Sequence, residues 1–226
     1  MIGTPLEEKI NGQNTTLIEE AYRQIKKLIF DQRIVPGQRL IYQDLVSQLE
    51  MSRTPIINAL NRLDQEGFVK YEDFRGFYVK PIDIQEVWDG FGVREALERY
   101  AVEQAIMQGE TEDLLLLEEK QKTYAEYMPH YYTQSKFLLD SEFHTQIAAM
   151  AKNRVLKYLL KRNFEHIFLR ARLDHYDPQR MVAEREEHQR LIDGIRRKDI
   201  IGSLEIVKNH VQTVRDQVLR CLSQNT

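Results

Sequence analysis

Four side chains that can bind a metal fall on apolar helical stripes in the second half of the chain. Asp140 and His144 are four residues apart, so on a helix they point to the same side. His188 and His210 each lie at three-and-four spacing among leucine, isoleucine and valine residues. Buried imidazoles and carboxylates are unfavourable unless their polar atoms are satisfied, and one divalent metal would satisfy all four together.

The ligand types narrow the choice of metal. Three neutral imidazoles and one carboxylate suit Zn²⁺, Ni²⁺, Mn²⁺ or Fe²⁺, with Zn²⁺ or Ni²⁺ slightly preferred. Coordination positions that the protein leaves open would attract a carboxylate from solution. Taken singly, a histidine on an apolar face is more often a hydrogen-bonded core residue, so it is the joint arrangement that favours a metal.

Long amphipathic helices must position these side chains. We predict six of them, at about 84–108, 111–127, 131–151, 154–173, 179–197 and 200–222. Gly109, Pro129, Asn153 and Pro178 mark the breaks between them. Because long amphipathic helices with short connections bury their apolar faces against each other, we predict an all-helical antiparallel bundle.

The first part of the chain has a different pattern. Amphipathic periodicity predicts helices at 15–31 and 42–49. A third helix begins at Ser52-Arg53-Thr54-Pro55, where Ser52 is expected to cap the free amides, and ends near Glu66. Two aromatic and β-branched runs, 68–71 and 77–80, then predict a β-hairpin.

Three helices followed by a hairpin make a winged helix-turn-helix. We therefore predict a mainly α protein, with a winged helix-turn-helix DNA-binding domain at 1–81 and the helical domain at 82–226, divided after Pro81. The helical domain is expected to bind the metal and an effector and to dimerise.

Composition and charge limit the class of protein. The sequence has no apolar run long enough for a membrane span and no signal peptide, so we expect a cytoplasmic protein without a membrane partner. Its single cysteine, Cys221, cannot form an internal disulfide. Residues 1–82 carry 11 basic and 11 acidic side chains. DNA affinity must therefore come from where the cations are placed, and not from a basic domain.

These motifs resemble the GntR family of winged-helix regulators, in the branch with an FCD domain (FadR-like). The first half matches at Pro36-Gly37-Gln38-Arg39-Leu40, Ser52-Arg53-Thr54-Pro55, Ala59-Leu60, Arg62-Leu63, Glu66-Gly67 and Gly76. The second half matches at Arg94-Glu95-Ala96-Leu97-Glu98, Ala101, Ala105, Asp140, Phe143-His144, Asn153, Glu187-His188, Asp199 and His210. The resemblance covers about residues 15–222 and implies a DNA-binding transcription regulator.

The sequence departs from the family pattern inside the third helix. Ile57-Asn58 stands where the family commonly has Arg-Glu, and Gln43 stands where a basic residue often lies in the second helix. Arginine is the commonest reader of guanine, because its planar fork makes two hydrogen bonds to that base. The family's usual operator sequence is therefore not expected to apply to this chain.

The expected DNA-reading residues gather at the start of the third helix and in the hairpin loop. A helix N-terminus suits phosphate, and its first side chains reach base edges in the major groove. Arg53 is the foremost candidate for a base contact. The other candidates are Ser52, Thr54, Asn58, Arg39, Arg75 and Gly76. The alternatives are that Ser52 only caps the helix and that Thr54, Asn58, Arg39 and Arg75 are solvent-exposed residues.

Arg94, in the first helix of the bundle, is the candidate for effector binding. In FCD domains such an arginine can approach the pocket, where its fork would hold a carboxylate of the effector. The alternative is an ion pair with Glu98, four residues later, on the helix surface.

The resulting hypothesis is a homodimeric repressor whose affinity for a double-stranded operator is controlled by a small carboxylic acid bound at the metal. Two copies are expected because one such module makes few contacts to DNA. One alternative is a regulator whose helical domain only dimerises around a structural metal. The other is a metal-dependent hydrolase, but the sequence lacks an HExxH helix and any obvious general base, so we expect no enzyme.

Overall fold

The computed structural model describes residues 17–170 and 176–223, which divide into two compact units. The first unit ends at Pro81 and the second begins at Ile82. The first two residues predicted for the helix at 15–31 and the last three predicted for the helix at 154–173 lie outside the described residues.

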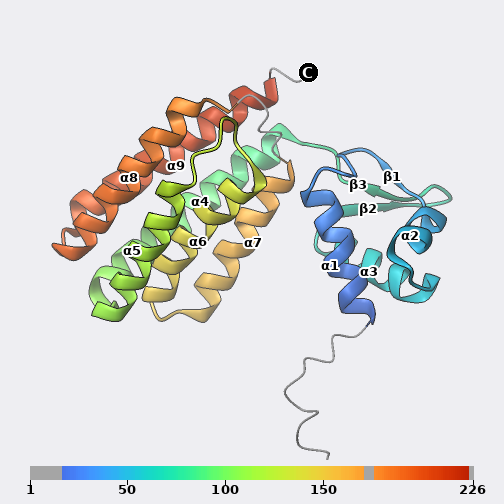
Figure 1. The fold of residues 1–226 in the computed structure, drawn as a ribbon, viewed down its shortest axis with the longest axis horizontal. Helices are drawn as coiled ribbons and strands as arrows, with labels where there is room; N and C mark the ends of the chain where they lie inside the picture. Colours follow the sequence, from blue (N-terminus) through green and yellow to red (C-terminus); the bar gives the residue numbers. More distant parts are fainter. Residues whose placement is uncertain (1–16, 171–175, 224–226) are drawn as a thin grey trace, which may run out of the picture. The chain divides into compact units, whose positions relative to one another are not determined.

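The first unit is a winged helix-turn-helix (Figure 1). Its elements, in chain order, are α1 (Leu17–Phe30), β1 (Arg39–Leu40), α2 (Tyr42–Leu49), α3 (Arg53–Gln65), β2 (Val69–Glu72) and β3 (Gly76–Val79). Helix α3 packs against α1, α2 and β2, so it lies at the centre of this unit. The apolar stripes that predicted the helices form its core, with Ile25, Ile56 and Leu60 completely buried.

The sheet has one more strand than the predicted hairpin. Strands β2 and β3 pair antiparallel as expected, and β1 adds to the other edge of β3, giving the order β1-β3-β2. The predicted hairpin is confirmed, and β1 is a third strand that the sequence did not indicate. Strand β1 has only two residues, Arg39 and Leu40, which is too short for the alternation of apolar and polar residues that identifies a strand.

The predicted cap of the third helix is only half right. Ser52 occupies the N-cap position of α3 with an extended backbone, but its side chain accepts no capping hydrogen bond. The third residue of the helix is Pro55, which has no N–H, so one of the two amides that an N-cap serine can bind does not exist here.

The second unit is all-helical in the residues that the structure describes (Figure 1). Its helices are α4 (Ile84–Gln108), α5 (Thr111–Glu126), α6 (Gln134–Met150), α7 (Arg154–Arg170), α8 (Pro178–Arg196) and α9 (Ile200–Ser223). Helix α4 packs against α6, α7, α8 and α9, and α5 packs against α6 and α8. This arrangement brings one face each of α4, α6, α8 and α9 into a shared interior. The predicted mainly α fold class is confirmed.

Polar side chains set where these helices begin. The carboxylate of Asp83 accepts hydrogen bonds from the amides of Gln85 and Glu86 at the start of α4. The hydroxyl of Thr133 accepts from the Lys136 amide, so α6 begins at residue 134, three residues later than predicted. None of the helices in the described ranges is long and apolar enough to cross a membrane.

Candidate functional site

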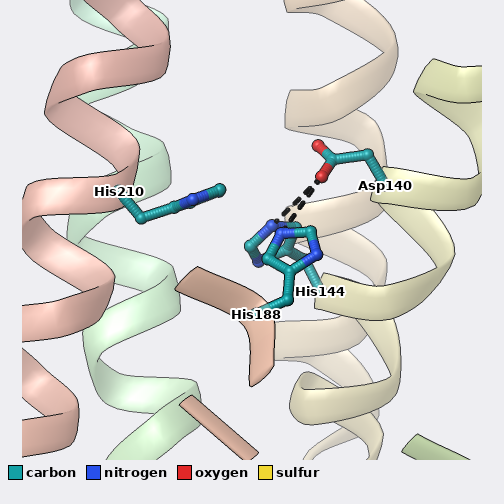
Figure 2. Close-up of side chains that lie close together, drawn as sticks. All are labelled: Asp140, His144, His188 and His210. Carbon is teal, nitrogen blue, oxygen red and sulfur yellow. Dashed lines mark ion pairs between the residues drawn. The ribbon is translucent and has the colours of Figure 1, made fainter. Parts of the chain in front are cut away.

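Three helices of the second unit bring the four predicted metal ligands together. Asp140 and His144 come from α6, His188 from α8 and His210 from α9, and all four are buried. One ligand atom of each lies within 4.8 Å of the others. Figure 2 shows the three rings and the carboxylate pointing toward one another. The cluster lies in the interior shared by these helices, as the apolar stripes around each ligand predicted.

The atoms that face the centre of the cluster lack hydrogen bonds. Oδ1 of Asp140 lies 3.5 Å from Nε2 of His144 and 3.4 Å from Nε2 of His188, which is too far for a good hydrogen bond. In the described part of the chain, none of these three buried atoms has a hydrogen-bond partner. Buried polar atoms left in this state are unfavourable. A bound cation would satisfy them, so the donor set fits a divalent metal.

A side-chain oxygen from outside the cluster lies near Nδ1 of each ring. Nδ1 of His188 lies 3.1 Å from Oε1 of Gln121 in α5. Nδ1 of His144 lies 2.7 Å from Oε2 of Glu98 in α4, an ion-pair contact whose geometry does not make a hydrogen bond. Acceptors at Nδ1 orient the ring, and they are the usual outer partners of histidines that bind metals through Nε2.

Glu187 orients the His210 ring through Nδ1. Its Oε2 lies 2.7 Å from Nδ1 of His210, and its two carboxylate oxygens lie 2.7 and 2.5 Å from the terminal nitrogens of Arg180. Burial raises the pKa of Glu187, but its contacts with His210 and Arg180 outweigh burial and lower that pKa to about 2. The carboxylate is therefore charged at neutral pH and accepts from the ring.

The pKa values of the three histidines differ, so that two rings are neutral at pH 7 and the third carries a proton. Burial lowers the pKa of His188 to about 3 and also lowers that of His210, so both rings are neutral at pH 7. Burial also disfavours the charged form of His144, but the charges of Glu98 and Asp140 outweigh it and raise the pKa of His144 to about 9. A metal that binds His144 must displace this proton.

Arg94 extends from α4 to the edge of the cluster. Its side chain is buried, with Nε 2.5 Å from Oε1 of Glu98 and Nη2 3.5 Å from Nε2 of His210. Nη2 also lies 3.8 Å from Oδ2 of Asp140. The ion pair with Glu98 exists, but in the interior and not on the helix surface. The Arg94 guanidinium therefore pairs with Glu98 and also faces Asp140 and His210, and its effector role stays a prediction.

A second buried polar group lies beside the cluster and was not predicted. The Glu184 carboxylate of α8 accepts hydrogen bonds from the hydroxyls of Tyr124, at 2.7 Å, and Tyr176. The Tyr124 ring also packs on His188, with centroids 4.8 Å apart. Burial and the charge of Asp140 raise the pKa of Glu184 to about 7.

Three of the residues that hold the cluster were missed as such. The sequence indicated Glu98 as a surface partner of Arg94 and as part of the family resemblance, Glu187 only as part of that resemblance, and Gln121 not at all. A signal existed for Glu98, which shares the stripe of Ala101 and Ala105 on α4.

The predicted DNA-reading residues of the first unit lie at its surface. Ser52, Arg53, Thr54 and Asn58 are exposed at the start of α3. The Arg53 guanidinium lies over the ring of Tyr42, 4.9 Å from its centroid.

The remaining candidates belong to the sheet. Arg39 is exposed on β1, and Arg75 is exposed in the loop between β2 and β3, with Nη1 3.4 Å from Oε2 of Glu72. Gly76 follows with φ of 90°, a conformation that glycine adopts without strain. These exposed positions are compatible with DNA contact.

Comparison with known families agrees with both units. Residues 17–79 match the family described as bacterial regulatory proteins, gntR family, and residues 89–213 match the FCD domain. The chain belongs to the GntR family of transcription regulators. It is accordingly a DNA-binding regulator with an FCD domain after its winged helix-turn-helix.

Individual relatives support this placement. The chain is 30% identical to the HTH-type transcriptional regulator YdhC of Bacillus subtilis, over 84% of each protein. It is 22% identical to the HTH-type transcriptional repressor RspR of Escherichia coli, over 92% of this chain and 91% of that one. The solved structure of McbR/YncC from E. coli shares the fold, with a TM-score of 0.78 and 20% identity over 93% of this chain and 99% of that chain.

Proposed function

We propose that this GntR-family regulator is a homodimeric repressor that binds a double-stranded DNA operator and releases it when a small carboxylic acid binds in the FCD domain. The acid binds beside a divalent transition metal held by Asp140, His144, His188 and His210. The observation that carries the proposal is the set of buried ligand atoms that have no hydrogen-bond partner. Zn²⁺, Ni²⁺, Mn²⁺ and Fe²⁺ all suit these ligands, with Zn²⁺ or Ni²⁺ slightly preferred.

The residues around the cluster have different roles in this proposal. Gln121, Glu98 and Glu187 hold the three rings so that Nε2 of each faces inward. When bound, the metal supplies positive charge and open coordination positions for a carboxylate oxygen. Arg94 holds a second carboxylate, or the far end of the acid, with the fork that faces the ligands.

Operator contact is assigned to the first unit. Arg53 reads a base in the major groove from the start of α3, with Ser52, Thr54 and Asn58 beside it. Arg75 and Gly76 of the wing and Arg39 of β1 contact the DNA backbone. The repressor role is supported by the similarity to RspR, which is described as a repressor. An acid can change operator affinity only if it binds the free and DNA-bound states differently.

One observation favours a second candidate. Four protein ligands are enough to fill a tetrahedral metal site. Structural metal sites typically have all four positions filled by the protein, so that none is left for another ligand. In that case the FCD domain would dimerise around a structural metal without sensing an acid. The sensor proposal instead requires an ion with five or six coordination positions, or one ligand that moves away. Every relative named above is a regulator, so the hydrolase alternative gains no support.

Fluorescence anisotropy distinguishes the two candidates. The probe is a labelled duplex selected by the purified protein from a random-sequence pool. Small mono- and dicarboxylic acids are added to the metal-loaded and to the chelated protein. The sensor proposal predicts that at least one acid releases the duplex, and only from the metal-loaded protein. If no acid changes the affinity and chelation still lowers the melting temperature, the metal is structural.

A further inference from the structure

Phe74 occupies the tip of the wing and is fully exposed to solvent. It lies in the short loop between β2 and β3, next to Arg75. Among the described residues, the structure gives its ring no aromatic or cationic partner. Single exposed hydrophobic residues are common, but a complete phenyl ring at the end of a hairpin leaves an unusually large apolar surface in water.

The backbone at Phe74 is strained as well. Its φ is 62°, in the left-handed region that favours glycine. The amide of Arg75 donates to the carbonyl of Glu72 at 3.0 Å, which closes a turn with Phe74 at its third position. A positive φ at that position normally selects glycine or asparagine. A bulky residue there costs about 1–2 kcal/mol, and no contact of the ring within the described chain offsets it.

The wing and the start of α3 belong to one continuous surface. The Tyr42 ring packs edge-on against Phe77 of β3, with centroids 6.3 Å apart, and the same ring carries the Arg53 guanidinium. The Tyr71 ring also packs against Phe77, with centroids 5.0 Å apart. The aromatic row therefore fixes the wing in relation to the residue assigned to base reading.

We propose that Phe74 is an apolar wedge that enters the minor groove beside the base pairs read by α3 and partly unstacks one base step. Apolar side chains inserted in this way bend the duplex, and they act most easily at flexible pyrimidine–purine steps. Arg75, next in the chain, meets the adjacent phosphate. Phe74 thereby selects a deformable TA or CA step at a position that α3 does not contact. This inference rests on the operator binding proposed above.

Two substitutions test the wedge. Phe74→Gly removes the ring and also suits the positive φ, so the melting temperature is expected to stay equal or rise. Phe74→Leu keeps an apolar wedge. The probe is the duplex selected by the unaltered protein, with 2-aminopurine placed in turn at the steps flanking the selected site. Affinity and its salt dependence are measured by anisotropy, and unstacking by the increase in 2-aminopurine fluorescence.

If Phe74 is a wedge, Phe74→Gly should weaken binding to the selected duplex about tenfold, which is the order of one base–aromatic stack. Phe74→Leu should lose much less affinity for the duplex. The slope of log affinity against log salt stays unchanged, because the ring neutralises no phosphate, and Arg75→Ala reduces that slope by about 1. The unaltered protein raises 2-aminopurine fluorescence at one flanking step, and Phe74→Gly does not.

Three results would overturn the wedge. Equal affinity of Phe74→Gly and the unaltered protein removes Phe74 from the interface, while the selected duplex still establishes operator binding. Weaker binding without a fluorescence change at any step shows contact without unstacking. A lower melting temperature of Phe74→Gly shows that the ring packs on the protein itself. Failure of the unaltered protein to select any duplex is a different result and contradicts the proposed function.

Discussion

Nδ1 of His210 lies 2.7 Å from Oε2 of Glu187, and this contact decides which nitrogen of the ring faces the cluster. Glu187 is held in turn by Arg180, so the orientation of His210 depends on two charged residues of α8. A ligand whose other nitrogen donates to a carboxylate is more basic and is fixed in one tautomer. The metal affinity of the site should therefore depend on Glu187, although this residue is not itself among the four ligands.

Replacing Glu187 by glutamine keeps the shape of the side chain but removes the charge that His210 and Arg180 contact. We expect metal affinity to fall by about tenfold, the lower end of the effect of such outer partners. Competition with a chromogenic chelator measures it. Glu186→Gln is the matched control, because Glu186 is the exposed neighbour on the same helix. Equal metal affinities of the two variants would contradict the role of Glu187.

Arg94→Lys tests the effector contact. Lysine keeps the positive charge beside Glu98 but loses the planar fork that can bind a carboxylate with two hydrogen bonds. Affinity for the releasing acid should fall by about tenfold or more, with the metal content unchanged. The control is Arg99→Lys on the same helix, where the arginine is half exposed and pairs with Glu95. An acid response as strong in Arg94→Lys as in Arg99→Lys would remove Arg94 from the effector site.

The raised pKa of Glu184 makes the stability of the chelated protein depend on pH. Its pKa is about 7 in the folded chain and near 4.5 when exposed, so between these values the folded state binds more protons. Glu184 therefore lowers the free energy of unfolding as pH rises from about 4.5 to 7. Glu184→Gln has no such group. Relative to the unaltered protein, the variant should gain stability between pH 5 and pH 8, on the order of 3 kcal/mol.

Denaturant unfolding at several pH values, in the presence of chelator, measures this difference. Glu186→Gln again serves as the control and should follow the unaltered protein at each pH. A stability difference between Glu184→Gln and the unaltered protein that stays constant from pH 5 to pH 8 would show that Glu184 does not titrate in this window.

Arg53→Ala tests the base contact. The loss of one bidentate contact should weaken binding to the selected duplex by about 10- to 100-fold, with little change in melting temperature, because Arg53 is exposed. Arg62→Ala is the control on the same helix. Arg62 pairs with Glu19 and lies over Tyr22, so its loss should lower stability and leave the affinity of the folded protein intact. Unchanged affinity of Arg53→Ala would exclude Arg53 from reading the operator.

The sequence predicted the helices well because long apolar stripes define them. The predicted 84–108 and 42–49 agree with the bounds of α4 and α2. It failed where the structure depends on pairing over a distance. Strand β1 forms only because β3 provides a partner, and two residues carry no periodic signal of their own.

The clustering of Asp140, His144, His188 and His210 could be predicted because histidine and aspartate on apolar stripes are unusual. Their supporting residues could not, because the sequence does not tell which ring each acceptor will meet. Gln121 and His188 are 67 residues apart and come together only through the packing of α5 on α8. The burial of the Arg94–Glu98 pair was hidden for the same reason, since the spacing of the two residues does not show whether the pair is buried.

The central claim is that a metal held by Asp140, His144, His188 and His210 creates the site for the acid. Its most direct test is the melting temperature of the protein, chelated or reloaded with metal, across a panel of small mono- and dicarboxylic acids. A ligand that binds only the folded state must raise stability by mass action. We expect chelation to lower the melting temperature and at least one acid to raise it in the metal-loaded protein alone. If neither chelation nor any acid changes the melting temperature, the four residues are a buried polar network, and the claim is wrong.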